Sequence, residues 1–223
     1  MSKPLLSLLI PITPDRIEVV RPLLKVLDAE RMNDVILDSM TVHGDTWVAK
    51  DEYIYEDGFH REIIMYCDNK QLTIGEKREN LYKRANGEYS IQIDSDDLIA
   101  EDAIRLILEG IKKHPGVDCV TFREHCRMNG EYKSSNHSLI YEKWQDNFDG
   151  YDYVRCPFYK DVIRTDIAKS VPFPKIRYGE DEQWSMALRP HLKTEYHIDR
   201  ELYYYFYAPK DTHEERYGFN RNA

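Results

Sequence analysis

Three carboxylates in four positions, Asp94, Asp96 and Asp97, follow directly after the apolar run "YSIQI" (89–93). That run predicts a buried strand, so the acids lie at its carboxyl end, where open α/β sheets hold their ligands. Asp96 or Asp97 could cap a helix that begins near Ala100, but capping accounts for one acid and not for three. Because like charges repel, a cation is needed to offset them, and carboxylate oxygens suit Mg²⁺ or Mn²⁺. We therefore expect a divalent-metal site at this strand end.

Acids also stand at two other predicted element ends. Asp68 closes the apolar run "EIIMYC" (62–67), which predicts a second strand. Glu180 and Asp181 open a predicted helix in "YGEDEQWSMAL" (178–188). Two acids at a helix N-terminus have a purely structural explanation, because they complement the helix dipole. A chemical role for them needs further support.

The apolar pattern predicts the scaffold that positions these acids. Strands alternate with helices along the first half of the chain, which implies a mostly parallel sheet with helices on its faces. The strands are expected at 5–11, 62–67, 89–93 and 118–124, and the helices after Thr13 and at 75–85 and 101–113. Two late apolar runs, 194–198 and 201–207, predict two more strands that complete the sheet. We interpret 31–60 as an insertion with a short hairpin, 126–160 as irregular and 208–223 as a polar tail.

Composition narrows the class of protein. The chain has 223 residues, of which 42% are hydrophobic and 32% charged, as in a soluble globular domain. The net charge of −9 argues against a nucleic-acid or membrane-surface binder, although a local basic groove could override it. The apolar run at residues 5–10 is too short for a signal-peptide core or a transmembrane helix. The four cysteines show no metal-type spacing, so we expect a reducing, cytoplasmic setting.

Several ordered motifs together resemble family 2 of the GT-A fold glycosyltransferases. After Asp68, the segment "GEKRENL" (75–81) opens a helix, and "ANGEY" (85–89) leads into the strand before "DSD" (94–96), which resembles the D-x-D motif. The downstream "YGEDEQWSMAL" (178–188) is similar to the Glu-Asp motif of that family. D-x-D alone is a weak signal, but three ordered pieces in fitting context are much stronger.

The resemblance covers about residues 4–124 and 155–207. It implies an α/β, GT-A fold: a Rossmann-like, mostly parallel sheet with helices on both faces and a small acceptor-side subdomain. The chain would be a single domain, with a nucleotide-sugar-binding half at about 1–124, an acceptor-binding half at about 125–207 and the tail at 208–223.

The resemblance also implies donor-binding roles. Thr13, at the end of the first strand, would lie beside the nucleotide, and Asp68 would accept a hydrogen bond from its base. Gly75, Lys77 and Arg78 would line the nucleotide, with a cation near phosphate.

For the metal, which would be Mn²⁺ or Mg²⁺, the resemblance implies that Asp96 is a ligand. Asp94 would touch the ribose or a metal-bound water, or join the ligand set. Asp97 would lie behind the metal ligands or cap the helix. A late histidine would be the third ligand, and we favour His213 over His197, which could equally be a packed strand residue.

The same resemblance makes Asp181 the catalytic base, with Glu180 beside it. This agrees with the chemistry of sugar transfer. A leaving nucleoside diphosphate gains charge, which a metal and cations must neutralise. The attacking hydroxyl must lose a proton to a carboxylate on the opposite face of the sugar, which gives a single displacement with inversion.

We therefore expect a cytoplasmic, metal-dependent, inverting glycosyltransferase that uses a nucleotide-sugar, with a UDP-sugar favoured, and a saccharide or glycoconjugate acceptor. An acceptor in nucleic acid, as in viral-type DNA glycosylation, stays open. A nucleotidyltransferase would need a glycine-rich basic loop after the first strand, which "IPITPDR" (10–16) lacks. The intact Asp181 argues against a protein that binds the nucleotide without catalysing transfer. The sequence specifies neither the sugar nor the oligomeric state.

Overall fold

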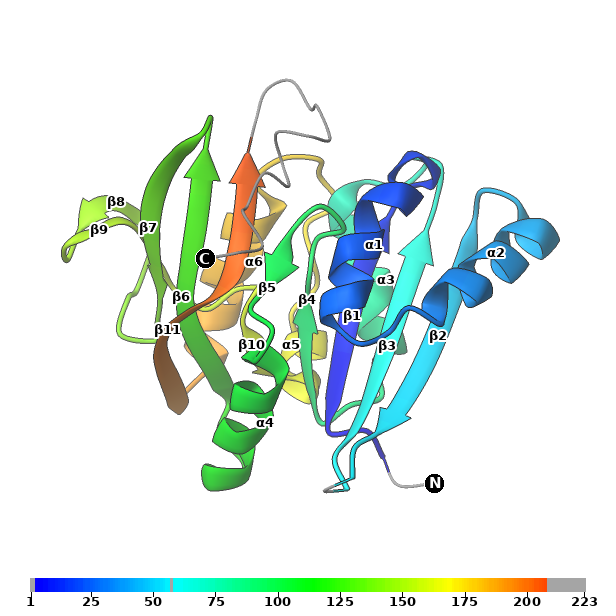
Figure 1. The fold of residues 1–223 in the computed structure, drawn as a ribbon. Coiled ribbons are helices and arrows are strands. Elements are labelled where there is room, and N and C mark those ends of the chain that lie inside the picture. The colour runs from blue at the N-terminus through cyan, green and yellow to red at the C-terminus, as the bar shows by residue number, and fades with distance from the viewer. Residues whose placement is uncertain (1–2, 57, 208–223) are drawn as a thin grey trace.

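A mixed sheet of eleven strands forms the centre of the molecule (Figure 1). The computed structural model describes residues 3–56 and 58–207. Three neighbouring strands, β3, β1 and β4, run parallel. The sheet order is β2 (Trp47–Ile54), β3 (His60–Cys67), β1 (Leu6–Ile12), β4 (Tyr89–Gln92), β10 (Val162–Arg164), β6 (Cys119–Met128), β7 (Glu131–His137), β9 (Tyr151–Arg155) and β8 (Gln145–Phe148). The long strand β11 (Glu195–Tyr207) pairs with β6 in parallel and with the short β5 (Leu98–Ile99).

Helices cover both faces of this sheet, as expected from the alternation of strands and helices. In Figure 1 the near face carries α1 (Ile17–Val26), α2 (Met32–His43) and α4 (Ala103–Lys113), and the far face carries α3 (Ile74–Arg84), α5 (Thr165–Ser170) and α6 (Glu180–Leu188). All seven residues of β1 are buried, and its side chains alternate between two cores. Leu8 packs with the near-face helices and Leu9 with the far-face helices. A strand buried on both faces reads as a continuous apolar run, which is why the sequence predicts it well.

Helix α3 begins at a capping box. Thr73 Oγ1 accepts a hydrogen bond from the Glu76 amide at 3.2 Å, and Glu76 Oε2 accepts one from the Thr73 amide at 3.0 Å. These two bonds satisfy amides that lack partners at a helix N-terminus. The helix is thereby fixed at the carboxyl ends of the strands, beside the functional motifs.

Gly75, in the first turn of α3, lies directly against another part of the backbone. A Cβ atom at this position would stand 1.9 Å from the carbonyl oxygen of Pro174. We expect Gly75→Ala to destabilise the fold by about 1–3 kcal/mol, because the 174–176 segment must move away. Thermal unfolding checks this, with Lys83→Ala on the exposed face of the same helix as the matched control. Equal melting temperatures for the two variants would contradict the close approach.

Three segments differ from the sequence-based prediction. Residues 31–60 contain α2 as well as β2, which forms an antiparallel hairpin with β3. The 126–160 segment is not irregular, because β7, β8 and β9 lie within it. The two late runs form one strand, β11, whose register against β6 shifts between Ile198 and Tyr203. In each segment the apolar pattern is weak or interrupted, although regular secondary structure forms there.

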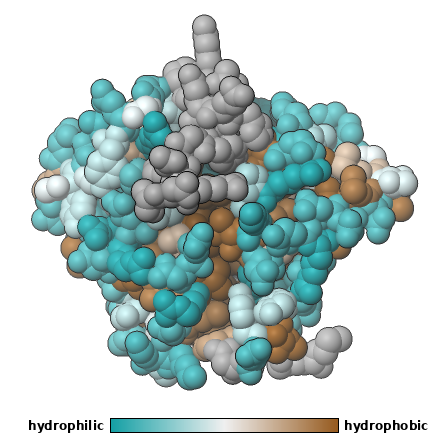
Figure 2. Space-filling model, in the orientation of Figure 1, coloured by the Kyte–Doolittle hydropathy of each residue, from teal (hydrophilic) through white to brown (hydrophobic). Residues whose placement is uncertain are grey.

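The surface, the cysteines and the helices add three observations. Hydrophilic residues dominate the face drawn in Figure 2, with apolar residues exposed in a central band. The four cysteines are buried and free. Among the described helices, none has the length and apolar character needed to cross a membrane.

Candidate functional site

A cavity of about 370 Å³ opens at the carboxyl edge of the parallel strands. Because β1 and β4 are parallel neighbours, their carboxyl ends meet at the same edge of the sheet. The size is typical of small-molecule sites. Among the twelve residues that line it are five of the predicted site residues, Thr13, Lys77, Arg78, Asp94 and Asp96.

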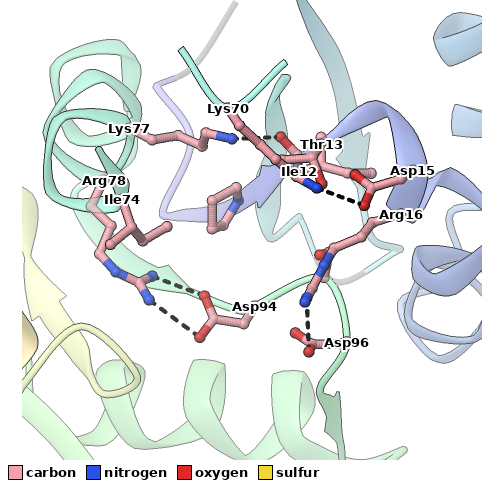
Figure 3. Close-up of a pocket in the computed structure, with 12 residues that line it drawn as sticks. Ile12, Thr13, Asp15, Arg16, Lys70, Ile74, Lys77, Arg78, Asp94 and Asp96 are labelled. Atoms are coloured by element: carbon pink, nitrogen blue, oxygen red, sulfur yellow. Dashed lines mark hydrogen bonds and ion pairs between the residues drawn. The ribbon is translucent and has the colours of Figure 1, made fainter. Parts of the chain in front are cut away.

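The walls of this pocket carry acidic and basic side chains that pair with one another (Figure 3). Arg16 contacts Asp96 at 2.7 Å, and Lys70 contacts Asp15 at 3.0 Å. Figure 3 shows Asp94 and Asp96 next to each other, with Asp94 paired to Arg78 and Asp96 paired to Arg16. The pocket therefore offers both cationic groups and a carboxylate to a ligand.

Arg78 of α3 joins the two acidic motifs. Its guanidinium donates to both carboxylate oxygens of Asp94, at 2.9 and 3.2 Å, and to Glu180 Oε1 at 3.2 Å. It also lies 3.5 Å from the centre of the Tyr159 ring. Because Arg78 is buried and Glu180 opens α6, this one side chain connects the end of β4 to the start of α6.

These contacts set the protonation of the two carboxylates. Burial by itself raises the pKa of Asp94, but the charge and hydrogen bonds of Arg78 outweigh it and lower the pKa. For Glu180 burial dominates, and it raises the pKa although Arg78 opposes the shift. Asp94 is therefore held as a carboxylate beside Arg78, as a charge-assisted bidentate pair should be.

Asp68 and Lys77 form a buried ion pair in which Lys77 lines the pocket. Lys77 Nζ also donates to the carbonyl oxygen of Ile12 at 2.7 Å, and Asp68 accepts from the Leu72 amide at 2.9 Å. Asp68 is only 1% exposed and does not line the cavity. Gly75 does not line it either, and its close approach to the backbone accounts for the glycine. The nucleotide-binding roles of both residues stay predictions.

The three acids that follow β4 have three different environments. Asp94 is held by Arg78 and by the Tyr159 hydroxyl, which donates to it at 2.8 Å. Asp97 is buried and accepts from the Tyr203 hydroxyl at 2.8 Å. Asp94 and Asp96 both line the pocket, with side chains that are 20% and 17% exposed. Because both oxygens of Asp94 are bound by Arg78, Asp96 is the carboxylate of the three best placed to meet a ligand.

Whether this site suits a divalent cation depends on the side chains that could act as its ligands. Within residues 3–56 and 58–207 no group of three or more His, Cys, Asp or Glu side chains could hold a metal ion. Mg²⁺, however, is often held by one or two carboxylates and completed by substrate phosphates. Asp96 fits that mode, with Asp94 nearby but engaged by Arg78.

Neither predicted histidine ligand joins the site in the described residues. His197 lies on β11, where its Nδ1 is 2.9 Å from Thr121 Oγ1 of β6, and it does not line the pocket. His213 lies outside the described residues. The identity of a third protein ligand stays a prediction.

The acids of α6 point in different directions. Glu180 is buried against Arg78, whereas Asp181 is partly exposed and accepts from the Glu182 amide at 2.9 Å. Burial raises the pKa of the Tyr159 phenol, the charge of Arg78 opposes this shift, and the charges of Asp94 and Asp181 add to it.

Comparison with known proteins identifies the family of the chain. The family model for glycosyl transferase family 2 matches residues 45–171, which is more than half of the chain. The chain belongs to glycosyl transferase family 2. No curated protein matches the sequence.

Solved structures support the GT-A fold of this family 2 domain. Residues 1–349 of TarS from S. aureus give a TM-score of 0.57 at 14% identity, covering 90% of this chain and 60% of that one. The TarS complex with UDP-GlcNAc gives 0.58 at 14% identity, with 92% and 59% covered. The complex with UDP gives 0.57 at 15% identity, with 92% and 61% covered. The family 2 domain therefore spans about 60% of the length of the TarS structure.

Two residues of this family 2 site escape the sequence-based prediction. Arg16 belongs to "TPDR" directly after β1, and the convergence of strand ends could have identified it. Tyr159 lies in a segment without apolar periodicity, and only the fold brings it 65 positions back to Asp94.

Proposed function

We propose that this family 2 domain transfers a sugar from a nucleotide-sugar to an acceptor hydroxyl, with inversion and with a divalent cation. The observation that carries the proposal is the pocket at the end of β1 and β4, where Asp96 meets Arg16 of the first loop and cationic side chains of α3 line the same cavity. A UDP-sugar is the favoured donor, which the UDP and UDP-GlcNAc complexes of the structurally similar TarS support.

The pocket offers separate positions for the parts of such a donor. Asp96 would hold the cation, which supplies positive charge to the leaving diphosphate. Arg16 reaches the same place and can turn from Asp96 to a phosphate oxygen, because its side chain is 37% exposed. Arg78 is buried and engaged, so it would act mainly by fixing Asp94. Thr13, on the loop after β1, would lie along the nucleotide.

The acceptor would approach from α6. Asp181, partly exposed at the first turn, would take the proton of the attacking hydroxyl. Glu180 would orient Arg78 through their 3.2 Å contact. We therefore propose donor binding at about 1–124 and acceptor binding at about 125–207. We propose a saccharide or glycoconjugate as acceptor.

Donor turnover tests the proposal. Wild-type protein is incubated with a panel of UDP-, GDP- and TDP-sugars in Mn²⁺, in Mg²⁺ and in excess chelator, and release of the nucleoside diphosphate is measured. We expect release from at least one UDP-sugar in metal and its loss in chelator. Equal release in chelator would contradict the metal, and release from GDP-sugars alone would contradict the donor class.

Arg16 gives a more local prediction. We expect Arg16→Gln to weaken UDP binding in Mn²⁺ by about 10-fold or more, because a hydrogen bond to a charged group is worth about 1.5–3 kcal/mol. Calorimetry with UDP measures the change. The matched control is Arg21→Gln in α1, whose partner is Glu18 and which does not line the pocket. Equal UDP affinity of the two variants would remove Arg16 from the donor site.

A further inference from the structure

Two consecutive residues, Tyr159 and Lys160, reach both ends of the acidic loop at residues 94–97. They belong to a tight turn at residues 158–161, in which Asp161 Oδ2 accepts from the Phe158 amide at 3.0 Å. The turn is bound to β4, because the Gln92 amide donates to the Tyr159 carbonyl oxygen at 2.9 Å. The turn therefore lies next to the acidic loop although it is some 65 positions away in sequence.

Tyr159 contacts the first acid of the loop. Its hydroxyl donates to Asp94 Oδ2 at 2.8 Å, while Arg78 lies over its ring. The hydroxyl and the guanidinium thus bind the same carboxylate oxygen. Asp94, which lines the pocket, is fixed in its orientation by these two partners.

Lys160 contacts the last acid of the loop. Lys160 is 4% exposed, and its ammonium group lies 3.7 Å from Asp97 Oδ2 and 2.6 Å from Glu124 Oε1. Asp97 also accepts from the Tyr203 hydroxyl, and this hydroxyl in turn accepts from the Asp94 amide at 3.1 Å. The Lys160 ammonium group therefore lies beside the buried Asp97, although Glu124 is its closer partner.

We propose that Tyr159 and Lys160 are positioning residues that hold the two outer acids of the 94–97 loop, so that Asp96 between them is presented to the metal and diphosphate of the donor. This inference rests on the proposed function of the pocket. It gives Asp97 a structural partner and gives the 158–161 turn, which lies on the acceptor-side half of the chain, a role in the donor site. Preorganised ligands of this kind need supporting groups that fix their orientation.

The alternative is that Lys160 only stabilises β6, because its contact with Glu124 is the shorter one. The two roles differ in what they do to metal-dependent binding. A stabilising role changes the melting temperature alone. A positioning role also changes how much Mn²⁺ strengthens the binding of UDP.

The experiment measures UDP affinity by calorimetry in Mn²⁺ and in excess chelator, for wild type, Tyr159→Phe and Lys160→Met. We expect the Mn²⁺-dependent gain in UDP affinity to fall about 10-fold or more in both variants, with affinity in chelator within about twofold of wild type. Glu124→Gln is the matched control, because it removes the other partner of Lys160. It should lower the melting temperature and keep the Mn²⁺-dependent gain.

Folding is safeguarded by two choices. Tyr159→Phe removes one hydroxyl and keeps the ring under Arg78. The double variant Lys160→Met with Glu124→Gln removes a cation and an anion together, so the net charge of the buried cluster stays the same. If Lys160→Met does not fold, the double variant takes its place. Retention of the Mn²⁺-dependent gain within twofold in Tyr159→Phe and in the Lys160 variant overturns the positioning role.

The outcomes also separate this inference from the proposed function. Wild-type protein that binds UDP with a Mn²⁺-dependent gain, beside variants that do the same, overturns the positioning role alone. Wild-type protein that binds no UDP in either buffer overturns the proposed function and this inference with it.

Discussion

Replacing Asp181 by Asn is expected to slow sugar transfer by about 10²–10⁴-fold, the usual contribution of a general base. Asn keeps the size of the side chain and its hydrogen bond at the start of α6, but it cannot accept the proton of the acceptor hydroxyl. UDP affinity should stay close to that of wild type, because Asp181 belongs to the acceptor side and does not line the donor pocket. The measurement pairs calorimetry with UDP and the rate of nucleotide release in the presence of acceptor.

Two controls separate catalysis from helix stabilisation. Glu182 is an exposed acid in the same first turn, so Glu182→Gln changes the interaction with the helix dipole in the same way as Asp181→Asn does. If only the helix dipole matters, both variants should keep nearly the full transfer rate. Glu180→Gln removes a contact of Arg78 and should lower the melting temperature. A rate for Asp181→Asn within a few-fold of wild type, or an equal rate loss in Glu180→Gln, would show that Asp181 is not the base.

The second large effect is expected at Asp96. Asp96→Ala should reduce transfer by at least about 10²–10³-fold, comparable to the loss of a group that stabilises charge in the transition state. It should also sharply weaken UDP binding in Mn²⁺ but not in chelator. Asp15→Ala is the matched control, because Asp15 is another acid of the same pocket whose partner is Lys70.

Asp97→Ala should reduce transfer less than Asp96→Ala does, because Asp97 is buried and does not line the pocket. Full activity of the wild-type protein in excess chelator would contradict the metal-binding role of Asp96. A loss in Asp15→Ala as large as in Asp96→Ala would show instead that the pocket is sensitive to any change of charge.

The central strands could be predicted because their burial is visible in composition. β1, β3 and β4 are apolar runs that end in an acid or a turn, and parallel strands bring those ends to one edge. The end of α3 follows from the Asn86-Gly87 stop signal, and α4 follows from its apolar stripe and its basic last turn. In contrast, α2 buries only Met32 and Ile36, so its apolar stripe is too thin to predict a helix.

The contacts inside the site could not be predicted in the same way. Strand-end placement puts Asp94 and Asp96 at the right edge, but it does not say which cation binds which carboxylate. Arg78 meets Glu180 across 102 positions of sequence. Lys160 meets Glu124 across 36 positions of sequence. Such pairs are decided by tertiary packing and leave no periodic signal.

The position of the metal and the diphosphate tests the assignment of this pocket most directly. Crystals of the wild-type protein grown with UDP and Mn²⁺ would locate the metal by its anomalous scattering. We expect one peak about 2 Å from a carboxylate oxygen of Asp96, with the diphosphate between Asp96 and Arg16. A metal peak away from Asp96, or UDP bound outside the pocket at the ends of β1 and β4, would contradict it.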